Sequence, residues 1–419
     1  MQSLNPKLFD ATIAATTEIL KLTSPADIML SRYFRENRSL GSHERPIIAD
    51  VAYSVIRNKT YLEEISGSKD APTMCLTSLN KIFGLSLTYL KANVSKKWHE
   101  SIENLKGRPT PKLSSEDRYS IPKWLWQKMS TQYGLDEASN LAQALLTKAP
   151  FDLRVNQVRT SRKQVLAALM SEGIEAKATS LSPLGIRIKE NFGLQKHKLF
   201  LEGHIEVQDE GSQILAQLVD AKRGQMVVDF CAGAGGKTLA LGAMMSNQGR
   251  LYAFDVSAKR LERLKPRLKR SGLSNVQTQL IGSEKDPRIQ RLAGKMDRVL
   301  IDAPCSGLGT LRRNPDMKWR QSETDISSMT DKQLRILSAA SKLVKKDGLL
   351  IYGTCSILRD ENESVIENFM AEQRGKFELV DAAQSLGIKG IGSQNTPYLK
   401  LLPNTHGCDG FFAAILRAL

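Results

Sequence analysis

The sequence has few cysteines and no long apolar run, and these absences exclude several classes of protein. Charged residues interrupt every apolar run before it reaches the roughly 18 residues that a membrane-spanning helix needs. The N-terminal residues lack a basic region followed by an apolar block, so we expect no secretory signal. The five cysteines form no CxxC pair and have no histidine-rich neighbourhood. We therefore expect no metal site, and free thiols in a reducing cytoplasm.

Acidic residues are too few to balance the basic ones. The chain has 60 Lys and Arg against 44 Asp and Glu, which gives a net charge of +16 and a pI of about 9.6. Such an excess attracts polyanions, so nucleic acid is the first partner to consider. A solvated surface rich in lysine would give the same balance, so the charge alone does not decide. We expect no membrane partner, and a monomer.

The spacing of apolar residues predicts several domains. Residues 1–106 show helical spacing without strand signals, which predicts a helical domain. The stretch 107–121 is rich in Gly, Pro and Ser and is typical of a linker. Residues 122–205 predict a small α+β module. From 206 to 419 strands and helices alternate, which predicts an α/β domain with a parallel sheet covered by helices on both faces.

The stretch "VVDFCAGAGGKTLALG" at 227–242 lacks both of the usual phosphate-loop patterns. A triphosphate loop needs GxxxxGK[ST], and Cys231 stands in place of its first glycine; the dinucleotide pattern GxGxxG is absent as well. An aspartate ends each of two successive predicted strands, Asp229 and Asp255. This pattern favours S-adenosylmethionine, because Asp255 can accept both ribose hydroxyls. A P-loop NTPase and a tight turn without a ligand are the alternatives.

Two cysteines, Cys305 and Cys355, each follow a predicted parallel strand and each precede a serine. The carboxyl ends of parallel strands form the ligand crevice of an open α/β sheet. A lone cysteine in a strand is commonly a small core residue, but two at equivalent positions favour a site. A thiolate that adds to C6 of cytosine makes C5 nucleophilic enough to take up a methyl group. Asp302 is placed to hold N3 or the amino group of the ring.

Five motifs, "DFCAGAGGKT", "YAFDVS", "DRVLIDAPCSGLGTLRRNPDMKW", "GTCSILRDENESVI" and "DGFFAAIL", together resemble the RsmB/Sun (Nop2/Sun) family of RNA cytosine-C5 methyltransferases. The resemblance is strong from 149 to 419 and weaker before 107, where the helices look like the family's NusB-like RNA-binding domain. It implies a Rossmann-like class I S-adenosylmethionine-dependent methyltransferase domain over 206–419, preceded by an α+β RNA-binding module at 122–205.

The resemblance also implies roles for the motif residues. Cys355 corresponds to the family's nucleophile, which forms a covalent adduct at C6, and Cys305 to the thiol associated with product release. Asp302 corresponds to the acid beside the reactive centre. DNA cytosine methyltransferases use a Pro-Cys thiol instead, which makes Cys305 the rival nucleophile. The implied cofactor set is Cys231, Ala232, Gly233, Ala234, Gly235, Gly236, Lys237, Asp255, Ser283 and Asp302.

The chain departs from the family pattern at two places of this cofactor set. Family loops usually read AAPGG, where residues 232–236 of this chain read AGAGG. Ser283 stands where the family usually has an aspartate on the adenine side of the cofactor. Asp286 is the alternative residue for that contact.

A basic segment follows the first thiol motif, and its charged residues are Arg312, Arg313 and Lys318. A solvated loop is one interpretation. At the mouth of a site that receives a flipped base, contact with RNA phosphates is the favoured one. Together these observations predict an S-adenosylmethionine-dependent RNA (cytosine-5)-methyltransferase acting on small-subunit (16S) ribosomal RNA. A tRNA methyltransferase and a non-catalytic RNA-binding ribosome assembly factor on the same fold are the alternatives.

Overall fold

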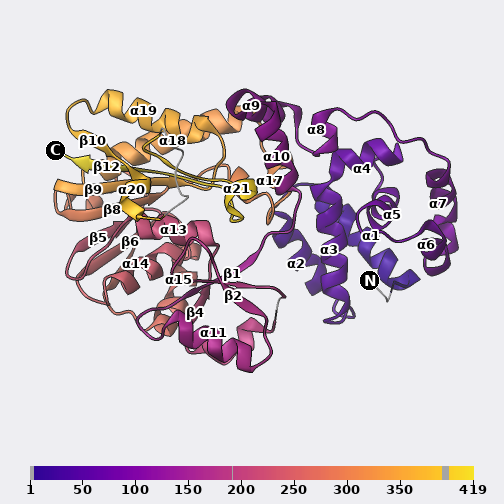
Figure 1. Ribbon diagram of the computed structural model, residues 1–419, viewed down its shortest axis with the longest axis horizontal. Coiled ribbons are helices and arrows are strands. Elements are labelled where there is room, and N and C mark those ends of the chain that lie inside the picture. Colours follow the sequence, from indigo (N-terminus) through magenta and orange to yellow (C-terminus); the bar gives the residue numbers. More distant parts are fainter. Residues whose placement is uncertain (1–3, 191, 389–395) are drawn as a thin grey trace. The chain divides into compact units, whose positions relative to one another are not determined.

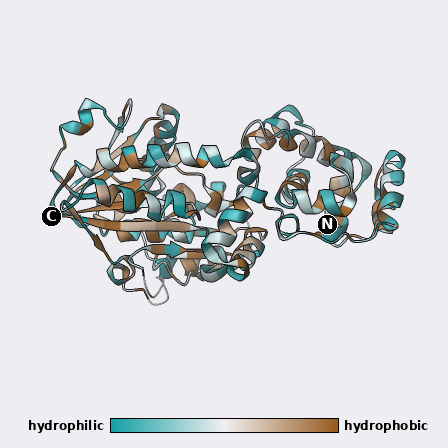
Figure 2. Cartoon of the chain, turned by 90° about the horizontal axis from the view of Figure 1, so that it is seen from above, coloured by the Kyte–Doolittle hydropathy of each residue, from teal (hydrophilic) through white to brown (hydrophobic). Residues whose placement is uncertain are grey.

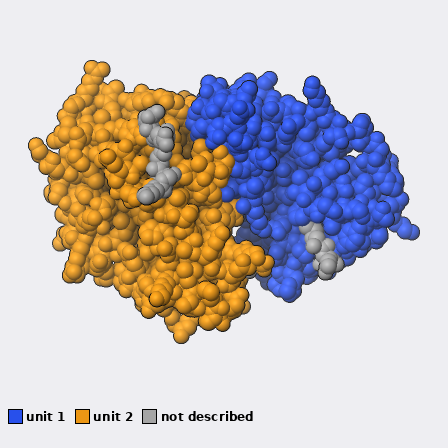
Figure 3. Space-filling model, viewed as in Figure 1, with its two compact units in different colours: residues 1–148, 310–323 blue, residues 149–309, 324–419 orange. Residues whose placement is uncertain are grey.

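The computed structural model describes residues 4–190, 192–388 and 396–419. The chain divides into two compact units (Figure 3). Unit 1 comprises residues 1–148 and 310–323, and unit 2 comprises residues 149–309 and 324–419. Among the residues described, every helix is too short or too polar to cross a lipid bilayer.

Unit 1 is built from helices. They are α1 (Pro6–Leu20), α2 (Ala26–Glu36), α3 (Glu44–Arg57), α4 (Lys59–Ser66), α5 (Ala71–Lys81), α6 (Leu87–Asn93), α7 (His99–Lys106), α8 (Ser115–Arg118), α9 (Lys123–Tyr133), α10 (Leu135–Leu145) and α17 (Met317–Arg320). The side chain of Asn5 caps α1 by accepting from the backbone N–H of Leu8. Buried side chains of α1, α3 and α5, such as Phe9, Val55 and Met74, form one of its cores.

The boundaries of unit 1 differ from those expected from composition. Helices α9 and α10 pack against each other and are grouped with the N-terminal helices, so the compact unit extends to Lys148. The domain boundary expected at 121 stays a prediction. The segment 310–323 also joins this unit. There Trp319 Nε1 donates to the carbonyl of Ile56 at 2.8 Å, and Asp316 accepts from the N–H of Ala26 at 3.2 Å. These bonds join segments far apart in the sequence, which composition does not reveal.

Unit 2 begins with a small antiparallel sheet in the order β2-β3-β1-β4. Its strands are β1 (Phe151–Val155), β2 (Ala176–Ala178), β3 (Gly185–Ile188) and β4 (Ile205–Val207), accompanied by α11 (Arg162–Ser171) and α12 (Lys198–Leu201). Ser161 and Gln164 form a capping box at the start of α11. The inward faces of β1 and α11, with Leu153 and Leu169, share one core.

The second sheet of unit 2 has the order β10-β12-β9-β8-β5-β6-β7, with β11 on β12. Its strands are β5 (Met226–Asp229), β6 (Arg250–Asp255), β7 (Val276–Leu280), β8 (Met296–Asp302), β9 (Val344–Thr354), β10 (Phe377–Val380), β11 (Leu399–Leu401) and β12 (Phe411–Ala418). Strands β5 to β9 are parallel, as expected. The C-terminal strands β10, β11 and β12 pair antiparallel, so the sheet is mixed.

Helices cover both faces of this sheet, and its strands are hydrophobic (Figure 2). The helices are α13 (Glu210–Leu218), α14 (Gly236–Met244), α15 (Ala258–Ser271), α16 (Pro287–Gln290), α18 (Glu323–Ser341), α19 (Glu363–Glu372), α20 (Ala382–Leu386) and α21 (Pro403–His406). Successive residues of one strand enter different cores, as Val227 packs with α13 and Val228 with α18. Figure 1 shows α18 and α19 on one side, and α13 and α14 on the other.

Candidate active site

The glycine-rich loop between β5 and α14 is held in a conformation that requires its glycines. Gly233 and Gly235 have φ of +56° and +85°, a region that residues with a side chain rarely adopt. A Cβ on Gly235 would lie 2.0 Å from Leu264 Cδ1, whereas one on Gly233 would meet nothing within 4 Å. Gly235 is therefore needed for packing against α15, and Gly233 leaves open space beside the loop. The AGAGG sequence fits this backbone.

The carboxylate of Asp255, at the end of β6, is fixed beside that loop. One oxygen, Oδ2, accepts from the N–H of Gly233 at 2.8 Å, and the other, Oδ1, accepts from the N–H of Ser257 at 2.7 Å. Asp255 is 4% exposed. Each carboxylate oxygen keeps a further lone pair for another donor. A nucleoside site at this position stays a prediction, and the geometry is compatible with it.

Lys237, at the start of α14, forms an ion pair with Asp302 across the ends of β5 and β8. Its Nζ lies 2.7 Å from Asp302 Oδ2. Burial opposes the charge of Lys237, but the Asp302 carboxylate raises the pKa of the amine above its ordinary value. The amine is thus committed to a carboxylate, unlike the lysine of a triphosphate loop, which reaches phosphates.

Asp229, at the end of β5, lies beneath the loop and is fully enclosed. Its Oδ2 accepts from Thr238 Oγ1 at 2.6 Å, whereas Oδ1 has no partner among the described residues. Burial raises the pKa of Asp229 to about 7. Thr238 was not among the residues predicted from sequence, although its place one residue after Lys237 is the signal that could have found it.

The two thiols meet at the carboxyl ends of adjacent parallel strands. Cys305 follows β8 and Cys355 follows β9, and their Sγ atoms are 3.3 Å apart. The hydrogen bond with Cys355 and burial hold the pKa of Cys305 well above its ordinary value. The raised pKa favours a proton on Cys305, although either thiol can donate the hydrogen bond between them. Both thiols are free.

A buried carboxylate, that of Glu361, holds the two thiol-bearing loops together. It is 0% exposed and accepts from the N–H of Ser306 at 2.7 Å and from the hydroxyls of Ser306 and Ser356. These serines directly follow Cys305 and Cys355 in the sequence. Gln333 of α18 donates to the same carboxylate at 3.1 Å. Glu361 was not among the residues predicted from the sequence, although the serine after each cysteine was a signal for a shared acceptor.

A close approach of backbones supports the same arrangement. The N–H of Gly309 donates to the carbonyl of Cys355, and the N–H of Gly410 donates to the carbonyl of Gly309, both at 2.8 Å. A Cβ on Gly309 would lie 2.3 Å from the carbonyl oxygen of Gly410. A residue larger than glycine does not fit there, and the loop after Cys305 is fixed against the loop after Cys355.

The residues proposed for the adenine side lie in the loop after β7. Asp286 accepts from the N–H of Gly282 at 2.9 Å and pairs with Arg288 at 2.7 Å. Hydrogen bonding to the Arg288 guanidinium holds the pKa of Asp286 well below its usual range. The hydroxyl of Ser283 accepts from the N–H of Lys285. Which of Ser283 and Asp286 contacts a cofactor stays a prediction.

The structure places the residues predicted to contact RNA in unit 1, and two of the three are buried. Lys318 is 3% exposed, and its Nζ donates to the carbonyl of Arg57 at 2.8 Å. Burial, with the nearby Arg57, lowers the pKa of Lys318. Arg312 is 5% exposed and accepts a hydrogen bond at its carbonyl from Arg57, and Arg313 is half-buried. Lys318 and Arg312 are therefore buried and not part of an exposed basic loop, and RNA contact by these residues stays a prediction.

The sequence predicts no metal site, and the side chains that bear on this prediction are those of His, Cys, Asp and Glu. Within the described ranges no group of three or more His, Cys, Asp or Glu side chains is arranged to hold a metal ion. The carboxylates near the thiols are instead satisfied by N–H, hydroxyl and ammonium donors, as Glu361 and Asp302 show.

The order of the strands, the glycine loop after the central strand β5 and the acid after β6 define a Rossmann-like class I S-adenosylmethionine-dependent methyltransferase domain. Solved structures share this architecture. The crystal structure of the protein PH0851 matches 99% of this chain and 99% of its own, with a TM-score of 0.80 and 26% identity. A methyltransferase homologue from Pyrococcus horikoshii matches 73% of this chain and 98% of its own, with a TM-score of 0.63 and 29% identity.

The chain belongs to the RsmB/F family. The family model described as "16S rRNA methyltransferase RsmB/F" matches residues 216–417, and a "ferredoxin-like domain" of the same family matches residues 121–195. The "Probable ribosomal RNA small subunit methyltransferase B" of Synechocystis sp. is 34% identical over 73% of this chain and 68% of its own length. The "Ribosomal RNA small subunit methyltransferase B" of Pseudomonas syringae is 35% identical over 71% of this chain and 66% of its own length. The ferredoxin-like model begins before α9, although the structure groups α9 and α10 with unit 1.

Removal of the Glu361 carboxylate should loosen both thiol loops. In Glu361→Ala the buried hydroxyls of Ser306 and Ser356 lose their acceptor, and we expect the free energy of unfolding to fall by about 3 kcal/mol. Urea unfolding measures the change. Glu367→Ala is the control, since Glu367 is half-exposed and pairs only with Arg359 among the ion pairs of the described chain. Equal stabilities of the two variants would contradict the role of Glu361.

The raised pKa of Asp229 predicts a pH-dependent difference between the wild type and Asp229→Asn. Below the unfolded pKa of 3.8 the acid is protonated in both states, and its burial does not lower the free energy of unfolding. Above that pH stability is lost progressively, and the loss is complete once the pH has risen through the folded pKa of about 7. The free energy of unfolding of the wild type should therefore fall, relative to the variant, by about 2 kcal/mol between about pH 5.5 and about pH 8. Urea unfolding across this range checks it, and a constant difference would show that Asp229 ionises normally.

Proposed function

We propose that this protein is an S-adenosylmethionine-dependent RNA (cytosine-5)-methyltransferase that acts on small-subunit ribosomal RNA. The observation that carries the proposal is the pair of thiols, Cys305 and Cys355, whose sulfur atoms lie 3.3 Å apart at the ends of β8 and β9. Two cysteines at this edge of the sheet match what addition to a pyrimidine ring and release from it require. The names of the relatives in Synechocystis and Pseudomonas syringae support the choice of RNA.

The residues around the glycine loop fit S-adenosylmethionine. The backbone at Gly233 is open to solvent space on the side where a Cβ would stand, and the carboxylate of Asp255 is fixed next to it. Asp255 would accept from the ribose hydroxyls, and residues 231–237 would lie along the methionyl part. S-adenosylmethionine, when bound, supplies an electrophilic methyl group that the activated C5 carbon of cytosine takes up.

In the proposed mechanism Cys355 is the nucleophile. Its thiolate adds to C6 of the cytosine, and the electron pair of the C5–C6 double bond becomes available at C5 for methyl transfer. The Cys305 thiol stabilises the neighbouring sulfur by donating a hydrogen bond, since its raised pKa keeps the proton on Cys305. After methylation C5 loses its proton to a base, and the Cys355–C6 bond breaks to restore the aromatic ring. Cys305 assists this release.

Asp302 is placed to orient the base. Its side chain is one-third exposed and lies at the end of β8, three residues before Cys305. A carboxylate can accept from the exocyclic amino group of cytosine. The ion pair with Lys237 fixes the position of the Asp302 carboxylate. A role for Lys237 in nucleotide hydrolysis is disfavoured, because this ion pair occupies the amine.

The substitution Cys305→Ser tests the assignment of the thiols. The variant retains Cys355 and should form the adduct with RNA but release it slowly, so a covalent protein–RNA species should accumulate in the presence of S-adenosylmethionine. Denaturing gel electrophoresis detects this species, and Cys355→Ser is the matched control that should give none.

Three other outcomes have distinct meanings. If Cys355→Ser accumulates the adduct and Cys305→Ser does not, the two roles are reversed. If the wild type binds RNA but calorimetry detects no binding of S-adenosylmethionine, the protein is a non-catalytic RNA-binding assembly factor. If bisulfite sequencing of RNA from a deletion strain shows the missing methyl group in tRNA, the substrate proposal is wrong and the chemistry stands.

A further inference from the structure

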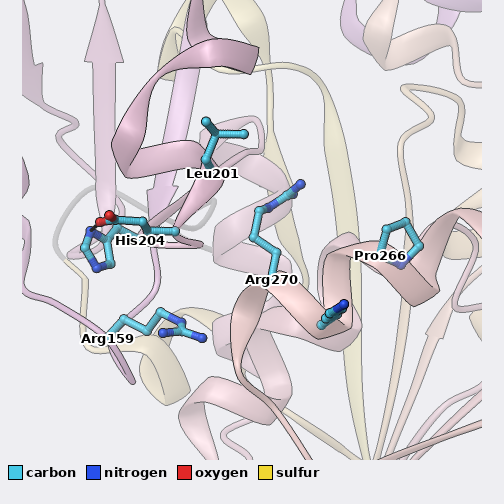
Figure 4. Close-up of a pocket in the computed structure, with 7 residues that line it drawn as sticks. Arg159, Leu201, His204, Pro266 and Arg270 are labelled. Atoms are coloured by element: carbon cyan, nitrogen blue, oxygen red, sulfur yellow. Dashed lines mark ion pairs between the residues drawn. The ribbon is translucent and has the colours of Figure 1, made fainter.

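A pocket of about 550 Å³ lies in unit 2, away from the residues of the candidate active site. One side consists of Pro266, Lys269 and Arg270 in the second half of α15. The other side consists of Arg159, Leu201, Glu202 and His204, which belong to the part of unit 2 that contains the small sheet. The basic side chains come from different elements around the pocket (Figure 4). Three permanently basic side chains therefore surround one concave surface.

The positive charge beneath this pocket exceeds the negative charge that balances it. The buried carboxylate of Glu206 accepts from both Arg267 and Arg270. Arg154, which is 3% exposed, faces the same carboxylate. Burial lowers the pKa of Arg154 to about 10, which leaves it charged at neutral pH. Three guanidinium groups thus share one carboxylate, and the excess favours an anion.

Two buried nitrogen atoms at the pocket, Arg270 Nε and His204 Nδ1, have no hydrogen-bond partner among the described residues, and the one on Arg270 is a donor. Glu202, the one carboxylate of the lining, is 3.8 Å from His204 Nδ1, beyond hydrogen-bond distance. Buried donors without acceptors are costly, so an incoming anion that accepts from Arg270 removes a cost already present in the protein.

The remaining basic groups are positioned and available. Arg159 uses Nε to donate to the carbonyl of Ser271 at 3.0 Å, which fixes its guanidinium beside the end of α15. Arg270 stacks on the ring of Phe200, 4.0 Å from its centroid. Lys269 is exposed and forms no ion pair in the part of the chain that the structure describes. Lys269 and Arg270 also complement the dipole at the C-terminal end of α15, which explains basic residues there without a ligand. That explanation does not account for Arg159, which lies on another element.

We propose that this pocket binds a backbone phosphate of the RNA substrate, outside the methyl-transfer site. The inference rests on the proposed function for the identity of the polyanion. A phosphodiester is favoured over a nucleotide base because Arg270 covers the Phe200 ring, so the pocket offers charge without an aromatic surface for stacking. Contacts of this kind fix the register of RNA on the protein without reading its sequence.

The pocket is connected to the glycine-rich loop through a single ion-pair network. Arg267 shares Glu206 with Arg270, and its Nη1 donates to the carbonyl of Ala234 in the loop at 2.7 Å. A phosphate on Arg270 would thus lie one ion pair away from the residue that holds the loop. RNA bound there would be held by the same helix, α15, that packs against the loop at Gly235.

The test compares two double variants of the full chain that remove the same charge. Arg159→Ala/Lys269→Ala empties the pocket of two basic groups and leaves the Glu206 network intact. Lys259→Ala/Arg260→Ala removes two exposed basic groups of the same helix, about 14 Å from Lys269 toward its N-terminal end. RNA binding is measured by fluorescence anisotropy between about 50 and about 200 mM salt, together with kcat and KM for methyl transfer.

We expect the pocket variant to bind RNA about tenfold more weakly, and its plot of log affinity against log salt to lose a slope of about 1 to 2. Its kcat at saturating RNA should be unchanged, whereas the control variant should change less than about twofold. Thermal unfolding verifies that both variants are folded.

An affinity and a salt slope equal to those of the control would overturn the proposal. So would binding of inorganic phosphate that depends on Arg159 and Lys269 while RNA binding does not, because the site would then serve a free anion. The anisotropy measurement of RNA binding gives a result whether or not the protein transfers a methyl group. Absence of methyl transfer by a wild type that binds RNA would therefore contradict the proposed function and leave the pocket to be judged by anisotropy.

Discussion

The buried carboxylate of Glu361 is the interaction on which the arrangement of the two thiols depends. A carboxyl group with no exposure to water is tolerated only where hydrogen-bond donors surround it, and here Ser306, Ser356 and Gln333 supply them. The serines belong to the loops after β8 and β9, so the need to satisfy one carboxylate brings both loops together. The short distance between Cys305 and Cys355 follows from this, and with it the hydrogen bond that keeps the proton on Cys305.

Fixed charges extend from this pair along the edge of the sheet. The Lys237–Asp302 ion pair joins α14 to β8, and Asp255 holds the glycine loop through the N–H of Gly233. Asp229 lies buried beneath the loop with Thr238 as its donor. Each acidic side chain is placed by the end of a different parallel strand, so the sheet determines the geometry of the site.

Much of the fold of unit 2 could be predicted from the sequence, because each strand and helix is indicated by the residues within it. Strand and helix patterns gave the alternation of β5 to β9, and the positions of Cys305 and Cys355 after strands indicated that they would meet. The antiparallel direction of β10 to β12 could not be predicted, since a strand pattern carries no direction. Glu361 was missed because its partners are distant in the sequence. The burial of Lys318 could not be predicted, because the carbonyl that accepts from its amine belongs to Arg57, more than 250 residues earlier in the chain.

The central claim is that Cys355, held beside a protonated Cys305, attacks the pyrimidine ring. It is tested most directly with an RNA substrate that carries 5-fluorocytidine at the target position. Fluorine at C5 cannot leave as a cation, so release of the nucleophile is blocked and the adduct is trapped on the wild-type protein. Protease digestion and mass spectrometry of the trapped species should identify the peptide that contains Cys355. Attachment of the RNA to the peptide that contains Cys305 would contradict the account.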